Sequence, residues 1–135
     1  MAIRNVVQVG DDILRKKCFE VTAFDEKLAQ LMDDLRDTVR KEEGAGLVDV
    51  AEGFYELINP VIVESKGEQR GYEGCLSVRG KRGIVTRPLV VKVEYSDRHG
   101  KRKKLVARGF FARAVCHELD HLDGILYTDR AERVE

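Results

Sequence analysis

The sequence is organised around one stretch, Val115-Cys116-His117-Glu118-Leu119-Asp120-His121-Leu122-Asp123-Gly124. On a helix of 3.6 residues per turn, His117 and His121 stand four positions apart and project from the same face. Two imidazoles placed in this way can bind one metal ion, and Glu118 then lies beside the open coordination position. A carboxylate at that position can take a proton from a water that the metal has acidified. The pattern therefore indicates metal-assisted hydrolysis.

The residues around this stretch predict that it forms a buried helix. Residues 109–123 contain no proline, and Gly124 stands where a left-handed residue commonly ends a helix. A lone buried histidine is more often satisfied by a hydrogen bond than by a metal, but two histidines at ligand spacing around a glutamate favour the metal. The apolar residues recur at helical spacing: Phe110, Phe111, Ala114, Val115, Leu119 and Leu122.

Length and composition limit the class of protein. A chain of 135 residues is long enough for one domain with a real core, so we expect a single domain over residues 1–135. The 24 basic and 24 acidic residues leave no positive surplus, and we therefore expect no nucleic-acid or membrane partner. No leader opens the sequence, no apolar run approaches the ~20 residues of a membrane span, and the cysteines are few and scattered. These features predict a soluble, cytoplasmic protein.

The rest of the sequence predicts one more helix and several strands. Apolar residues at helical spacing follow a capping-box-like start at residues 22–25 and continue to Lys41. We read residues 64–70 as a polar connection, and the Lys101–Lys104 cluster as a protected sheet edge rather than a nucleic-acid contact. The fold class is then α+β, with the metal helix packed against an antiparallel or mixed sheet. Strands are expected at residues 47–50, 54–63 (with a bend at Asn59-Pro60), 89–95 and 101–107.

The third metal ligand distinguishes the possible families. Catalytic zinc sites generally use three protein ligands. Downstream, the spacing from His117 to Tyr127 is close to that of the metzincin proteases, except that Tyr127 stands where their third histidine would be. Upstream, Cys75 lies in the glycine-flanked stretch Glu73-Gly74-Cys75-Leu76-Ser77, and its thiolate would complete a site suited to Fe²⁺, Zn²⁺, Ni²⁺ or Co²⁺. A His-Glu-x-x-His zinc peptidase or amidase that does not need Cys75 remains the alternative.

With the upstream cysteine included, the sequence resembles the peptide deformylase family. The matching pieces occur in the family's order and at roughly its spacing from residue 1 to about residue 130. They are Glu73-Gly74-Cys75-Leu76-Ser77, the histidine stretch His117–Gly124, the preceding Ala112-Arg113, and Phe54-Tyr55-Glu56-Leu57-Ile58-Asn59-Pro60.

This resemblance implies the chemistry and its participants. One divalent metal per chain, Fe²⁺ in the cell, would be held by Cys75, His117 and His121, with Glu118 as general base and then acid. The backbone N–H of Leu76 would donate to the developing oxyanion. The substrates would be N-formylmethionyl nascent peptides, met at the ribosome, and the product would be formate. Substrate contacts are expected at Gly44, Ala45, Gly46, Glu73, Phe110 and Ala114, with Glu73 also able to pair with Arg113. Monomer and dimer both remain open.

The chain departs from the family in its first motif, which reads Gly-x-Gly-Leu-Ala-Ala-Pro-Gln. Here Gly44-Ala45-Gly46-Leu47 runs directly into Val48-Asp49-Val50. The Ala-Ala-Pro-Gln turn and much of the next strand are therefore read as deleted, with residues 48–50 as the remnant. The resemblance implies that the amide of the missing glutamine is one of the groups that polarise the formyl carbonyl, and losing one such oxyanion donor typically lowers kcat roughly 10²–10³-fold. We therefore expect a deformylase of weakened or altered activity, and the alternative is a non-catalytic relative with a metal-binding or regulatory role.

Overall fold

The computed structural model describes residues 21–41, 48–50, 53–75 and 78–135 of the chain. The predicted substrate contacts Gly44–Gly46 and the predicted oxyanion donor Leu76 lie outside these residues. The described elements are α1 (Glu26–Lys41), β1 (Val48–Val50), β2 (Gly53–Tyr55), β3 (Ile58–Lys66), β4 (Gln69–Cys75), β5 (Val78–Arg87), β6 (Val90–Ser96), β7 (Arg102–Arg108), α2 (Phe110–Leu122) and α3 (Tyr127–Arg130).

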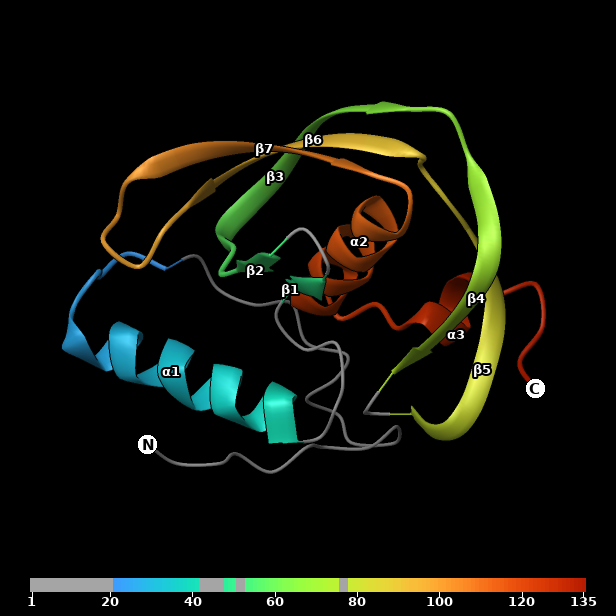
Figure 1. The fold of residues 1–135 in the computed structure, drawn as a ribbon, viewed down its shortest axis with the longest axis horizontal. Coiled ribbons are helices and arrows are strands. Elements are labelled where there is room, and N and C mark those ends of the chain that lie inside the picture. Colours follow the sequence, from blue (N-terminus) through green and yellow to red (C-terminus); the bar gives the residue numbers. More distant parts are fainter. Residues whose placement is uncertain (1–20, 42–47, 51–52, 76–77) are drawn as a thin grey trace.

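The predicted metal helix is α2, and it lies at the centre of the fold. It packs beneath a sheet with the strand order β3-β6-β7 (Figure 1). Alternate residues of β6, Val91 and Val93, turn into the core and meet the buried face of α2, which includes Phe111 and Val115. The described strand pairs are all antiparallel, which confirms the predicted α+β class.

A second hairpin, formed by β4 and β5, stands beside α2 and holds the helix from another side (Figure 1). Residues 64–70 were predicted to be a polar connection, and this prediction is wrong, because β3 runs to Lys66 and β4 begins at Gln69. Only the turn at Gly67-Glu68 separates them, with Gly67 at a φ of 66°. The strand ends were missed because most of these residues are exposed and show no apolar alternation.

The other predicted elements are present, with small changes. The strand expected at residues 54–63 is divided into β2 and β3, and β3 carries a register shift after Ile58 where Asn59 has a φ of 51°. The α1 helix begins later than residues 22–25 suggested, because the Asp25 carboxylate accepts the Leu28 N–H at 3.1 Å and caps the helix. The remnant strand Val48–Val50 is β1, paired with β2.

Within the described part of the chain, no helix combines the length and the apolar character needed to cross a membrane.

Candidate metal centre

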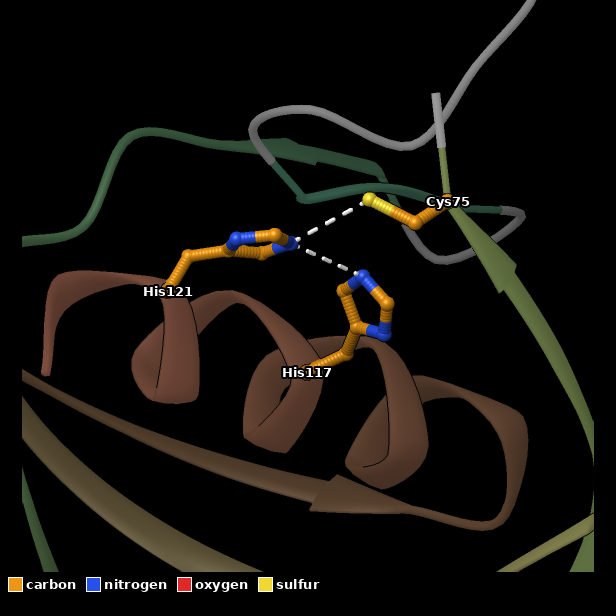
Figure 2. A group of neighbouring side chains, drawn as sticks. All are labelled: Cys75, His117 and His121. Atoms are coloured by element: carbon orange, nitrogen blue, oxygen red, sulfur yellow. Dashed lines mark hydrogen bonds between the residues drawn. The ribbon is translucent and has the colours of Figure 1, made fainter. Parts of the chain in front are cut away.

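The two histidines of α2 point their Nε2 atoms toward one another, as two ligands of one metal would. The helix begins after Gly109, whose φ is 60°, and ends before Gly124, whose φ is 75°, so glycines in the left-handed region bound it at both ends. The Nε2 atoms of His117 and His121 lie 3.1 Å apart. Figure 2 shows both imidazoles projecting from the same face of the helix. The i, i+4 spacing of the sequence therefore produces the expected pair.

The third predicted ligand, Cys75, reaches this pair from the end of β4. Its Sγ lies 3.4 Å from the His121 Nε2, and the ligand atoms of Cys75, His117 and His121 all lie within 4.8 Å of one another (Figure 2). A tetrahedral ion with bond lengths of about 2.0–2.3 Å separates such ligand atoms by about 3.3–3.6 Å. The spacings of 3.1 Å between the two imidazole nitrogens and 3.4 Å between the sulfur and His121 lie within a few tenths of an ångström of these values, so this set of donors suits a tetrahedral metal.

The state of His117 also fits a cation at this position. Its Nδ1 lies 2.9 Å from the Glu73 carboxylate, which can only accept, so Nδ1 carries the hydrogen and donates it. When the ring is neutral, its Nε2 lone pair points toward His121. Burial opposes a charge on His117, but Cys75, Glu73 and Glu118 outweigh it and raise the pKa of the imidazole to about 10. The surroundings of this ring therefore favour a positive charge, whether a proton or a metal ion supplies it.

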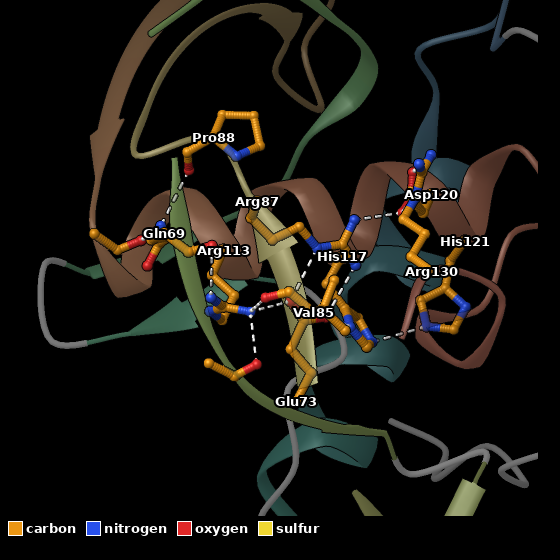
Figure 3. A network of polar contacts seen from close by, with 12 residues as sticks. Gln69, Glu73, Val85, Arg87, Pro88, Arg113, His117, Asp120, His121 and Arg130 are labelled. Atoms are coloured by element: carbon orange, nitrogen blue, oxygen red, sulfur yellow. Dashed lines mark hydrogen bonds and ion pairs between the residues drawn. The ribbon is translucent and has the colours of Figure 1, made fainter. Parts of the chain in front are cut away.

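Glu73 is buried behind His117 and is saturated with donors. Its carboxylate accepts two hydrogen bonds from Arg87, both at 2.9 Å, and one from Arg113 at 2.7 Å, in addition to that from His117 (Figure 3). Burial raises the pKa of this carboxyl, but the bonds from Arg87 and His117 outweigh burial and lower it to about 2. The predicted Glu73–Arg113 pair is present. With its oxygens occupied in this way, Glu73 orients the ring of His117, and its predicted contact with a substrate stays a prediction.

Glu118 lies beside the metal ligands on α2, half-buried. Burial raises the pKa of its carboxyl well above the usual value; the charge of Cys75 raises it further, and that of His117 lowers it. A raised pKa makes a carboxylate a stronger base, and so better able to take up a proton and later release it. This is the property that the predicted role of Glu118 requires.

The remaining predicted contacts divide between exposed and buried positions. Phe110 is 68% exposed at the start of α2, and Ala114 is buried one turn further on. Their spacing, 110, 114, 117 and 121, places them on the histidine face of the helix. Tyr127, the residue at the third metzincin position, is buried and stacks on His117 with ring centroids 6.1 Å apart. It packs against a ligand, while Cys75 completes the cluster.

Sequence reasoning missed the residues that support this centre from behind. Arg87 is buried at the end of β5, and Asp120 lies on α2 between the two histidines. Their only signal in the sequence was a charged residue inside an apolar pattern. A cysteine and two histidines at these distances, with a carboxyl at their side, are the arrangement of a mononuclear metallohydrolase.

Comparison with known proteins identifies the family. The profile of the family described as polypeptide deformylase matches residues 3–51 and 49–135. The peptide deformylase of Thermoanaerobacter pseudethanolicus is 44% identical over 146 positions, covering 98% of this chain and 92% of that protein. The crystal structure of peptide deformylase from Thermotoga maritima has a TM-score of 0.95 at 31% identity, covering 98% of this chain and all of that one. The chain belongs to the polypeptide deformylase family.

The same comparisons locate the difference from the family. The 146 aligned positions exceed the length of this chain, so the relative carries residues that are absent here. The family profile breaks into two matches that overlap at residues 49–51, close to the deletion predicted directly after Leu47. The peptide deformylase of Synechococcus elongatus, solved in complex with actinonin, still has a TM-score of 0.91 at 34% identity, covering 96% of this chain and 79% of that one.

Proposed function

We propose that this protein releases formate from N-formylmethionyl peptides with one divalent metal held by Cys75, His117 and His121. Membership of the polypeptide deformylase family, with relatives 40–44% identical over nearly the whole chain, supports the reaction. The observation that carries the metal centre is the meeting of one sulfur and two imidazole nitrogens within 4.8 Å. A deformylase is a metalloenzyme, and the donor set is suited to that role.

The roles follow from where each group lies. When bound, the metal supplies Lewis-acid activation of a water and of the formyl carbonyl. Glu118 takes the proton from the attacking water and passes it to the departing amine nitrogen, while Glu73 holds His117 in its metal-binding tautomer. The C–N bond of the formamide breaks, and the products are formate and a peptide with a free amino terminus.

We place the methionine side chain of the substrate along the face of α2 that carries the histidines. Phe110 and Ala114 share that face, and the exposure of Phe110 leaves its ring free to contact an apolar side chain. The backbone N–H of Leu76 is proposed as the oxyanion donor, and residues 44–46 as the backbone that pairs with the peptide. Without the glutamine of the family motif, turnover is expected to be roughly 10²–10³-fold below that of an intact site.

We propose Fe²⁺ as the metal in the cell, as the family resemblance implies; a thiolate with two imidazoles accepts several ions, and availability decides among them. Zn²⁺, Ni²⁺ and Co²⁺ fit the same set of donors. We further place the enzyme in the cytoplasm, where nascent peptides emerge from the ribosome. Metal analysis of protein purified without oxygen checks the first assignment, since iron below one equivalent with zinc in its place would contradict it.

The deciding experiment measures formate release from formyl-Met-Ala-Ser by anaerobic protein loaded with Fe²⁺ or Ni²⁺. A Glu118→Ala variant with the same metal content is the control, and it should lose about 10²–10⁴-fold in rate if Glu118 moves the proton. Formate release that Glu118→Ala abolishes would support the proposal. No release from protein holding one metal per chain would show that the deletion has removed the activity.

A further inference from the structure

A chain of charged side chains extends from the candidate metal centre to the exposed Arg130 on α3. Beyond Glu73, the buried Arg87 donates through Nη1 to Asp120 at 2.6 Å. Asp120 in turn accepts two hydrogen bonds from Arg130, at 2.6 and 3.0 Å. Figure 3 shows these side chains in sequence between His117 and Arg130. The side chains become more exposed along the chain, from 3% at Arg87 to 14% at Asp120 and 46% at Arg130.

This chain joins the two elements that supply the metal ligands. Glu73 lies on β4, two residues before Cys75, and Asp120 lies on α2, directly before His121. One guanidinium, that of Arg87, binds both carboxylates. It therefore connects the strand that supplies the sulfur to the helix that supplies the imidazoles. The separation of these two elements determines whether the three ligand atoms can share one ion.

On the side away from Glu73, the guanidinium of Arg87 borders open space and is not enclosed by packed side chains that the structure describes. A cavity of about 460 Å³ opens there between β3 and α2, and Arg87, Asp120 and Arg130 all form part of its wall. The remaining lining is largely apolar, with Ile62 and Leu119 among it. If Asp120 were absent, the Nη1 end of Arg87 could turn into this space, because no side chain of the described residues fills it. Arg113 would still hold Glu73 in place.

We propose that Asp120 and Arg130 are positioning residues of the metal centre. By fixing Arg87, they complete the link between β4 and α2 that Arg113 and His117 also make through Glu73, and so adjust the position of the Cys75 sulfur relative to the two imidazoles. This inference rests on the metal centre of the proposed function. It predicts that residues with no contact to the metal determine how firmly and with what geometry the thiolate binds it.

The test uses the full-length protein loaded with Co²⁺, whose absorption reports thiolate ligation and coordination geometry. Two quantities are measured: the spectrum at saturating cobalt, and the rate at which cobalt passes to an excess of chelator. For Asp120→Ala, we expect dissociation about tenfold faster, at the lower end of the range for residues behind metal ligands, together with a weakened or shifted thiolate band. Arg130→Met should change both quantities in the same direction by a smaller amount, and its exposed position makes it the variant least prone to misfold.

A matched control separates positioning from a general loss of surface ion pairs. Arg70 makes a two-bond pair with Glu132, at 2.8 Å for each bond, and both side chains are exposed. Arg70→Met should therefore leave the spectrum and the dissociation rate unchanged. If Asp120 only stabilised the fold, Asp120→Ala would leave the cobalt spectrum of the loaded, folded protein unchanged. A changed spectrum in that variant therefore reports a change in the position of the ligands.

The outcomes distinguish this inference from the proposed function. If Asp120→Ala and Arg130→Met match the wild type in spectrum and rate, the positioning role is wrong and the metal centre stands. If the wild-type protein shows no thiolate band, or if Cys75→Ser leaves that band unchanged, the metal centre itself is wrong and both proposals are overturned.

Discussion

Replacing Glu73 by glutamine tests the buried network behind His117. The carboxylate of Glu73 is 4% exposed and accepts hydrogen bonds from Arg87, Arg113 and His117. Glutamine has nearly the same shape, but it is neutral and replaces one acceptor with a donor. The substitution would leave two buried guanidinium groups without their shared counter-charge. We expect Glu73→Gln to destabilise the metal-free protein strongly.

Two arguments give a similar magnitude. The pKa of Glu73 falls from 4.5 to about 2 on folding, and at 1.36 kcal/mol per pKa unit this corresponds to about 3 kcal/mol. Because the folded pKa is the lower one, this stability is present above pH 4.5 and is lost as the pH falls toward 2. Breaking a buried ion pair from one side independently costs about 3–5 kcal/mol. The substitution therefore removes a large part of the roughly 5–15 kcal/mol typical of a domain.

Urea unfolding of the metal-free protein at pH 7 measures this change. The sequence contains no tryptophan, so far-ultraviolet circular dichroism is the suitable signal. A loss of about 3 kcal/mol should lower the midpoint by about 1–2 M urea. Glu132→Gln, which breaks the exposed pair with Arg70, should leave the midpoint nearly unchanged. The reasoning is refuted if Glu73→Gln unfolds at the wild-type midpoint, or if the wild type and the variant lose stability equally between pH 4.5 and pH 2.

Two further predictions concern the packing and the protonation of the site. A Cβ added at Gly83 would lie 2.9 Å from the Cβ of Ala131 and 3.1 Å from the ring of Tyr127, so Gly83→Ala should cost about 1–3 kcal/mol in urea unfolding. Gly74→Ala is the control and should be nearly neutral, because its nearest neighbour would be at 3.6 Å; equal effects of the two substitutions would contradict the steric argument. The proton on His117, whose pKa is raised to about 10, must leave when a metal binds, so the apparent Zn²⁺ affinity measured with a competing chelator should rise about tenfold per pH unit from pH 6.5 to 8.5. An affinity independent of pH over that range would show that His117 holds no competing proton.

The strand pairing shows where sequence reasoning failed. The hairpin of β6 and β7 was predicted correctly, because Val91 and Val93 alternate with polar residues and a turn follows. The β4–β5 hairpin was not predicted, although it carries Cys75 and Glu73. Its strands are rich in glycine and charged residues, so they show little of the apolar alternation that identifies a strand.

The sequence by itself determined the parts of the site that depend on local geometry. The helical spacing of His117 and His121 fixed the face of α2 on which they lie, and the residues around Cys75 made it the candidate third ligand through a family resemblance. The position of the deletion was also visible, because the family motif is interrupted after Leu47 and the profile match breaks at residues 49–51.

Only the tertiary structure decided which buried charges meet. Glu73 and His117 are 44 residues apart, and Arg87 and Asp120 are 33 apart, and their pairing depends on the register of β4 against β5 and on how α2 packs between the strands. Helical or strand periodicity indicates which face a residue occupies, but not which residue on another element it will face. Since the cost of a buried charge depends on its partner, the pKa values of Glu73 and His117 could be assigned only after those partners were known.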